Sequence, residues 1–151
     1  MRRTFLILSL VFASQLAVFA GASSDPFVTA VNEAWVKKDD AALATLMEKN
    51  LKDRPDDILV LAAAYNYYTL FMPDLPKATE LANKIKVIAD KNPDNPGLKG
   101  FSDGLQKKLP AQTESGLKPV DDKKRESIHK VFPQQYPGMS LGIVLQDAMK
   151  K

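Results

Sequence analysis

The 151-residue sequence contains no cysteine and only one histidine, His129. A chain without cysteine forms no disulfide bonds, so packing alone must hold its fold. Zinc sites are usually built from cysteine and histidine, which this chain cannot supply in sufficient number. The sequence also lacks a glycine-rich phosphate loop and a serine within a Gly-x-Ser-x-Gly turn. It therefore predicts no enzyme activity, no catalytic residue, no metal and no cofactor.

A large excess of charge of either sign is missing as well. The whole chain carries 21 basic and 18 acidic residues, and two of the basic ones, Arg2 and Arg3, belong to a segment that we expect to be removed. Without these arginines, 19 basic residues stand against 18 acidic ones. Nucleic acids and anionic membranes bind strongly basic surfaces, so this balance predicts neither as a partner.

The first 22 residues have the order of a secretory signal peptide. Arg2 and Arg3 precede the apolar run FLILSLVFASQLAVFA, and the small residues Ala20–Ala22 complete it. A basic start, an apolar middle and a small-residue cleavage site define such signals. We expect cleavage after Ala22. An uncleaved membrane anchor is the alternative, although the run is shorter than the roughly 20 residues of a spanning helix.

Export without cysteine also predicts a compartment. Small proteins of the eukaryotic secretory route commonly carry disulfide bonds, so a cysteine-free exported chain favours a bacterial envelope. The N-terminal cysteine that a lipid anchor requires is missing too. We expect a periplasmic or secreted protein with no stable membrane insertion after cleavage. The motif RRTFL resembles the core of a twin-arginine signal, so the general and the twin-arginine export routes both remain open.

After residue 23 the apolar residues recur at helical spacing, and turn-forming residues separate the apolar stretches. Asp25 and Pro26 have the order of an N-cap and a first-turn proline, and Asn95 and Pro96 repeat it. The most apolar stretch, ILVLAAAYNYYTLF, is the predicted centre of the fold. Helices are predicted over residues 26–37, 40–54, 58–71, 77–90, 96–109 and 140–151, with a short helix over 127–132. The expected fold class is all-α.

The first four predicted helices form two similar pairs. Units that begin at Ser24 and Ile58 are 34 residues apart, and Pro55 and Pro93 close them 38 residues apart because FMPDLP adds four residues to the second. The pattern resembles a degenerate pair of tetratricopeptide repeats, with residues 96–109 similar to the first helix of a third unit. The resemblance implies antiparallel helix pairs stacked as a short solenoid. An unrelated antiparallel helical bundle is the alternative.

In tetratricopeptide proteins the first helix of each unit lines a concave surface that receives an extended peptide or a partner's helix. The resemblance therefore implies that Asn32 and Asn66, which share one repeat position, face a partner. An amide side chain both donates and accepts, so two of them could hold a peptide backbone in register. Trp35 and Thr69, one turn later, would widen this partner-binding surface. Alternatively, Asn32 and Asn66 are solvated helix residues and Trp35 belongs to the core.

The C-terminal part divides into a linker and a terminal segment. Residues 110–127 are polar and contain turn-forming residues, which predicts a linker. The stretch VFPQQYPGM is expected to run extended over the surface. One face of the helix that Ser140 begins is apolar and carries Leu141, Val144, Leu145, Ala148 and Met149. We expect this helix to cap the open end of the stack, because repeat arrays need a capping element. Docking into another protein or another copy is the alternative.

The sequence thus predicts a signal peptide over 1–22, a helical domain over 23–109, a linker over 110–127 and a C-terminal segment over 128–151. The resemblance implies a non-catalytic protein-protein interaction scaffold or adaptor of the bacterial cell envelope. Its partner would be another envelope protein or a peptide. The alternative is a small helical periplasmic protein that binds an apolar ligand beside residues 58–71, or that serves as a structural component.

Overall fold

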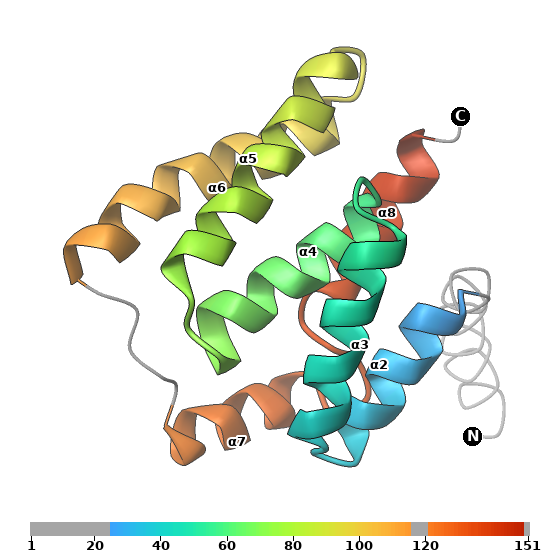
Figure 1. Cartoon of the computed structure of the whole chain (residues 1–151), viewed down its shortest axis with the longest axis vertical. Coiled ribbons are helices and arrows are strands. Elements are labelled where there is room, and N and C mark those ends of the chain that lie inside the picture. Colours follow the sequence, from blue (N-terminus) through green and yellow to red (C-terminus); the bar gives the residue numbers. More distant parts are fainter. Residues whose placement is uncertain (1–24, 116–120, 150–151) are drawn as a thin grey trace, which may run out of the picture.

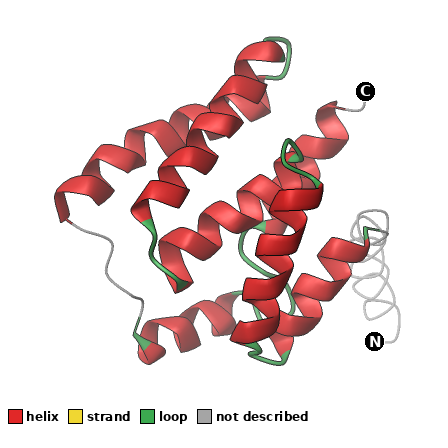
Figure 2. Ribbon diagram, in the orientation of Figure 1, coloured by secondary structure: helices red, strands yellow, loops and turns green. Residues whose placement is uncertain are grey.

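The computed structural model describes residues 25–115 and 121–149, and every regular element in these ranges is a helix (Figure 2). The elements are α2 (Pro26–Val36), α3 (Asp40–Asp53), α4 (Ile58–Asn66), the π-helix η1 (Tyr67–Phe71), α5 (Leu75–Lys91), α6 (Pro96–Ser115), α7 (Asp122–Val131) and α8 (Met139–Met149). The predicted all-α fold class is confirmed. The predicted signal peptide lies outside the described residues.

Aspartate side chains define where most of these helices begin. The Asp25 carboxylate accepts from the backbone N–H of Phe27 at 2.9 Å, and the Asp57 carboxylate accepts from that of Leu59 at 2.9 Å. Such caps satisfy N–H groups that have no partner within the helix. Equivalent caps are made by Asp39 for α3, Asp74 for α5 and Asp121 for α7. The predicted starts of α2 to α6 and of α8 are therefore confirmed within two residues, whereas α7 begins at Asp122, five residues before its predicted start at residue 127.

From α2 to α6, helices that follow one another in the sequence are also neighbours in space (Figure 1). α2 packs on α3, α4 packs on both α3 and α5, and α5 packs on α6. Residues Ile58–Tyr65 of α4 are all buried, which confirms the predicted centre of the fold. α7 lies beside the turn between α2 and α3, and α8 returns along α4. The tetratricopeptide relationship of the helix pairs stays a prediction.

The segment 110–127 differs from the predicted linker. α6 continues through Pro110 to Ser115, and α7 begins at Asp122, so only residues 116–120 separate the two helices and these lie outside the described residues. Proline inside a helix removes a hydrogen bond. Leu109, just before the proline, is buried in the core, and α6 packs against α5. The charged run after residue 120 is helical because Asp121 caps it.

The buried face of α8 also differs from the prediction. Leu141 and Val144, which were expected to be buried, are 44% and 64% exposed. The buried residues are Met139, Gly142 and Leu145. A Cβ added to Gly142 would lie 3.0 Å from the Leu59 Cα, so the glycine lets the two helix backbones approach closely. This close approach, rather than the larger aliphatic side chains, decides which side of α8 faces the core.

The position of α8 corrects the predicted cap as well. The helix packs mainly against α4, at the centre of the fold, and not over the open end beyond α6. α4 offers the most apolar surface of the described residues, so it is the surface that gains most from being covered. The C-terminal segment therefore contributes to the main core.

Candidate functional site

Three ring side chains from distant parts of the chain meet around Trp35 of α2. Its ring centroid lies 5.3 Å from that of Phe71 in η1 and 5.5 Å from that of Tyr136, which is edge-on. The imidazole of His129 in α7 stacks on the indole with 3.7 Å between centroids. Trp35 and Tyr136 are 1% and 0% exposed. Such aromatic contacts stabilise beyond the apolar area that they bury.

Two polar contacts fix the segment that contains Tyr136 to α2. The Trp35 Nε1 donates to the carbonyl of Phe132 at 2.7 Å. The backbone N–H of Tyr136 donates to the Oδ1 of Asn32 at 2.9 Å. The residues between these two contacts form bends, so the segment is not extended as predicted. Side chains of α2 thus bind the backbone of a distant segment. We refer to Asn32, Trp35 and Phe71 as the aromatic face.

The π-helix η1 places Phe71 on this face. The N–H of Met72 donates to the carbonyl of Tyr67 at 2.9 Å, five residues back. Turns of this kind are rare and frequently occur at functional sites. The hydroxyl of Thr69 donates to the carbonyl of Tyr65 at 2.9 Å within the same helical stretch. The widened turn therefore turns Phe71 toward Trp35 while Thr69 stays buried.

The segment crosses α4 at Gly138. A Cβ at this position would lie 2.8 Å from the Ala63 Cα and 3.0 Å from the Ala62 carbonyl oxygen. Both neighbours are backbone atoms, which cannot move aside as the end of a flexible side chain can. Gly138 and Gly142 therefore fix the start of α8 tightly against α4.

The helix α7 is held much less tightly. It has no buried residue, and its ion pairs lie at the surface. Arg125 pairs with Asp40, and the Lys38 Nζ pairs with the Glu126 Oε1 at 3.2 Å. Exposed pairs of this kind contribute at most about 1 kcal/mol each. α7 contacts the aromatic face through His129, which stacks on Trp35, and through Arg125, whose guanidinium lies 5.6 Å from the centroid of the Phe71 ring.

Acidification is expected to weaken this contact. Burial first, and then the positive charges of Lys38 and Arg125, lower the pKa of His129 from its ordinary value of 6.5. The carboxylates of Glu126 and Asp40 act in the opposite direction but more weakly. Between the two pKa values the unfolded chain binds more protons than the folded chain. Stability is therefore expected to fall as the pH drops below the ordinary histidine pKa.

Denaturant unfolding at about pH 7.5 and about pH 5.5 measures this loss. The His129→Gln variant, which cannot take up the proton, should lose less stability over the same interval. Equal losses in both chains would show that His129 does not carry the effect.

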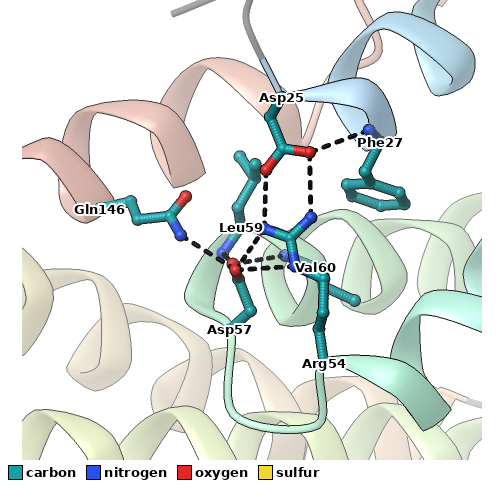
Figure 3. A network of polar contacts seen from close by, with 7 residues as sticks. All are labelled: Asp25, Phe27, Arg54, Asp57, Leu59, Val60 and Gln146. Atoms are coloured by element: carbon teal, nitrogen blue, oxygen red, sulfur yellow. Dashed lines mark hydrogen bonds and ion pairs between the residues drawn. The ribbon is translucent and has the colours of Figure 1, made fainter.

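A network around Arg54 fixes the relative positions of α2, α4 and α8 (Figure 3). The Arg54 guanidinium donates to both carboxylate oxygens of Asp25, at 3.0 and 2.7 Å. Its Nε donates to the Asp57 Oδ2 at 3.1 Å, and the Gln146 Nε2 donates to the same oxygen at 3.0 Å. Hydrogen bonds to Asp25, ahead of those to Asp57, raise the pKa of Arg54 and keep it charged. The carboxylates that cap α2 and α4 are thereby joined through one side chain.

The structure places the four predicted partner-binding residues differently. Asn32 and Trp35 meet at one site and contact the segment 132–136. Asn66 is half-buried at the end of α4, and its carbonyl accepts from Thr69. Thr69 is 7% exposed, and its hydroxyl donates to carbonyl groups of its own helical stretch. The partner-binding role of these residues stays a prediction.

Sequence reasoning did not identify the other members of the site. The sequence pattern does not single out Phe71 or Tyr136, and it indicates His129 only as a single histidine, too few for a zinc site. The sequence signal for Tyr136 was available, since an aromatic residue between Gln135 and the Pro137-Gly138 pair stands out in a polar stretch. Phe71 gave no such signal, because its orientation depends on the π-helix.

Among residues 25–115 and 121–149, no group of three histidine, cysteine, aspartate or glutamate side chains is placed to hold a metal ion. No helix within the described part of the chain combines the length and apolar character needed to cross a membrane. Comparisons with protein-family models, with curated proteins and with solved structures find no match.

Proposed function

We propose that the mature protein is an exported, non-catalytic interaction scaffold of the bacterial envelope that binds a segment of a partner protein on its aromatic face. One observation carries the proposal: Asn32 and Trp35 already bind the backbone of the irregular segment 132–136. Both residues belong to the partner-binding surface that the tetratricopeptide resemblance implies. Their polar groups bind backbone atoms, which every polypeptide offers.

The two contacts are chemically complementary. The Asn32 Oδ1 accepts an N–H, and the Trp35 Nε1 donates to a carbonyl, so together they satisfy both kinds of backbone group. The buried surroundings strengthen both hydrogen bonds relative to water. A surface of this kind recognises a peptide by its backbone conformation and by the side chains that fit beside the two hydrogen bonds.

The alternative of an apolar ligand bound beside residues 58–71 has less support. The side chains of α4 are buried against neighbouring helices, and α8 covers them further. The apolar surface that would hold such a ligand therefore already contributes to the core. A structural role without a specific partner remains the simplest competing function.

A photo-cross-linking residue placed at Glu33, beside Asn32, tests the proposal in cells that export the chain. Glu80 on α5 is a matched control site: each glutamate is 63% exposed and pairs with a lysine four residues later. We expect a specific protein to be cross-linked from position 33 and not from position 80. A lipid or small molecule captured from position 33 would support the alternative.

Joint replacement of Asn32 and Asn66 by alanine should reduce this capture. Asn83→Ala, an exposed asparagine on α5, serves as the control variant. Circular dichroism must show the same helix content in all chains. Unchanged capture by a folded double variant would contradict the proposed binding site.

A further inference from the structure

We infer that the partner segment carries a tyrosine or phenylalanine side chain and binds by displacing the chain's own segment 132–136 from the aromatic face. The inference rests on the proposed function, since it names the chemistry of the partner for the same site. It adds that residues 132–136 act as an internal ligand that covers the site. The contacts of this internal ligand show what the site recognises.

The internal ligand presents three groups with a fixed spacing. The carbonyl of Phe132 accepts from Trp35, and four residues later the N–H of Tyr136 donates to Asn32. The Tyr136 ring packs against both Trp35 and Phe71, at 5.5 and 5.9 Å between centroids. A partner that fits the same contacts therefore offers a carbonyl, then an N–H four residues on, with an aromatic side chain at the second position.

The arm that carries this ligand, α7 to α8, is held unevenly along its length. α8 meets the backbone of α4 closely at Gly138 and Gly142. Before that point, Val131 and Phe132 are 69% and 40% exposed. α7 has no fully buried residue, and it is held by surface ion pairs, the stacked His129, the half-buried Ile128 and the contact of Arg125 with the Phe71 ring. Segments with few buried contacts open at low cost. The part of the arm from α7 to Tyr136 can therefore leave while α8 stays in place.

The fit of Tyr136 is also incomplete. Its hydroxyl is buried and has no hydrogen-bond partner. Burying a polar group without a partner costs stability, whereas the same ring without a hydroxyl avoids that cost. The internal ligand is therefore weaker than the face allows, which leaves room for a partner segment to compete.

Competition has a quantitative consequence. Only molecules whose site is open can bind an added peptide. The apparent dissociation constant is therefore the intrinsic one divided by the open fraction. An internal ligand on a short tether acts at an effective concentration of roughly millimolar. Changes that open the arm should therefore tighten peptide binding, and changes that close it should weaken binding.

The probe is a fluorescently labelled peptide with the sequence of residues 131–139, VFPQQYPGM. Its binding is measured by anisotropy to the complete mature chain, residues 23–151, and to two variants of Tyr136. Tyr136→Ala removes the ring that closes the site, and Tyr136→Phe removes only the unpartnered hydroxyl. We expect Tyr136→Ala to bind the peptide at least about tenfold more tightly than the unchanged chain, and Tyr136→Phe to bind it more weakly.

The requirement for an aromatic ring is tested with a second peptide in which the residue matching Tyr136 is alanine. It should bind Tyr136→Ala at least about tenfold more weakly than the first peptide. Adding Asn32→Ala to Tyr136→Ala should weaken binding of the first peptide as well. Equal binding of both peptides, or equal binding by all chains, overturns the inference.

A milder variant tests the inference in case Tyr136→Ala does not fold. Arg125→Gln together with Glu126→Gln removes both surface ion pairs of α7 and the contact of Arg125 with the Phe71 ring, and it leaves the core side chains in place. This chain should also bind the peptide more tightly than the unchanged chain. If it stays folded and does not, the arm does not cover the site in the proposed way.

The same measurements separate this inference from the proposed function. If a partner cross-links at position 33 but the peptide neither binds Tyr136→Ala nor competes with that partner, the scaffold function stands and the inference fails. If the peptide binds as expected and no protein is captured in cells, the recognition chemistry stands and the envelope function fails.

Discussion

Replacing Arg54 by alanine is expected to lower the free energy of unfolding by about 3 kcal/mol. The side chain joins the carboxylates that cap α2 and α4, and one of these carboxylates also binds Gln146 of α8. Arg54, Asp25 and Asp57 are 31%, 23% and 14% exposed at the side chain, so water screens their contacts only in part. Without the guanidinium, two neighbouring carboxylates lose their common counter-charge. Denaturant unfolding followed by circular dichroism measures the loss.

Arg125→Ala is the matched control for this prediction. Arg125 also pairs with an aspartate in a cap region, but Asp40 is 55% exposed at the side chain. Loss of this ion pair and of the contact between Arg125 and the Phe71 ring is expected to cost about 1 kcal/mol. Arg54→Lys should fall between the two alanine variants, because an ammonium group cannot reproduce the forked contact with Asp25. If Arg54→Ala costs no more than Arg125→Ala, the network does not join the helices.

Replacing Trp35 by alanine is expected to cost about 3–5 kcal/mol. The indole is 1% exposed and contacts Phe71, His129 and Tyr136, so its removal leaves a cavity where α2, η1, α7 and the segment 132–136 meet. The carbonyl of Phe132 also loses its donor. Denaturant unfolding gives the free energy, and hydrogen exchange should show faster exchange at the N–H of Tyr136 than at amides of α4.

Two further variants separate packing from hydrogen bonding at this position. Trp35→Phe keeps an aromatic ring but lacks the indole N–H, and its additional cost beyond lost volume should be about 1–3 kcal/mol. Val36→Ala, one residue further on and 54% exposed, should change stability by less than about 0.5 kcal/mol. If Trp35→Ala is as mild as Val36→Ala, the aromatic face does not hold the arm.

The helix boundaries could be predicted from the sequence because local chemistry determines them. Asp25 before Pro26 and Asp57 before Ile58 each cap a helix through contacts two or three residues away. The widened turn of η1 was not predicted, since neither its composition nor its spacing differs from an ordinary helix end. The sequence predicts Arg54 only as the end of α3, because its partner Asp25 lies 29 residues away.

The orientation of α8 shows where a periodicity argument fails. The apolar spacing singled out Leu141 and Val144, but both are exposed. The spacing of apolar residues indicates which side of a helix offers the most apolar area. It does not indicate how closely the helix backbone can approach a neighbouring helix. Gly142 contributes no apolar side chain, yet it allows the backbone of α8 to approach α4 closely. Gly138 and Gly142, four residues apart, indicate the side of α8 that approaches α4, and an argument from large apolar side chains overlooks them.

The candidate site could be predicted in part. An asparagine on α2 was expected to bind a backbone, and Asn32 does bind one. That this backbone belongs to the same chain could not be predicted, because Asn32 and Tyr136 are separated by 104 residues and nothing local to either indicates the contact.

The same separation determines the order in which the fold is completed. The packing of α2 through α6 joins helices that are adjacent in the sequence, whereas the contacts of Trp35 with Phe132 and of Asn32 with Tyr136 span 97 and 104 residues. Long loops close more slowly than short ones, and a chain that emerges from its N-terminus folds its early segments first. We therefore expect the contacts of the aromatic face with residues 132–136 to form late in folding, after the packing of α2 through α6. A molecule in which α2 through α6 have packed would then carry the site in its open form.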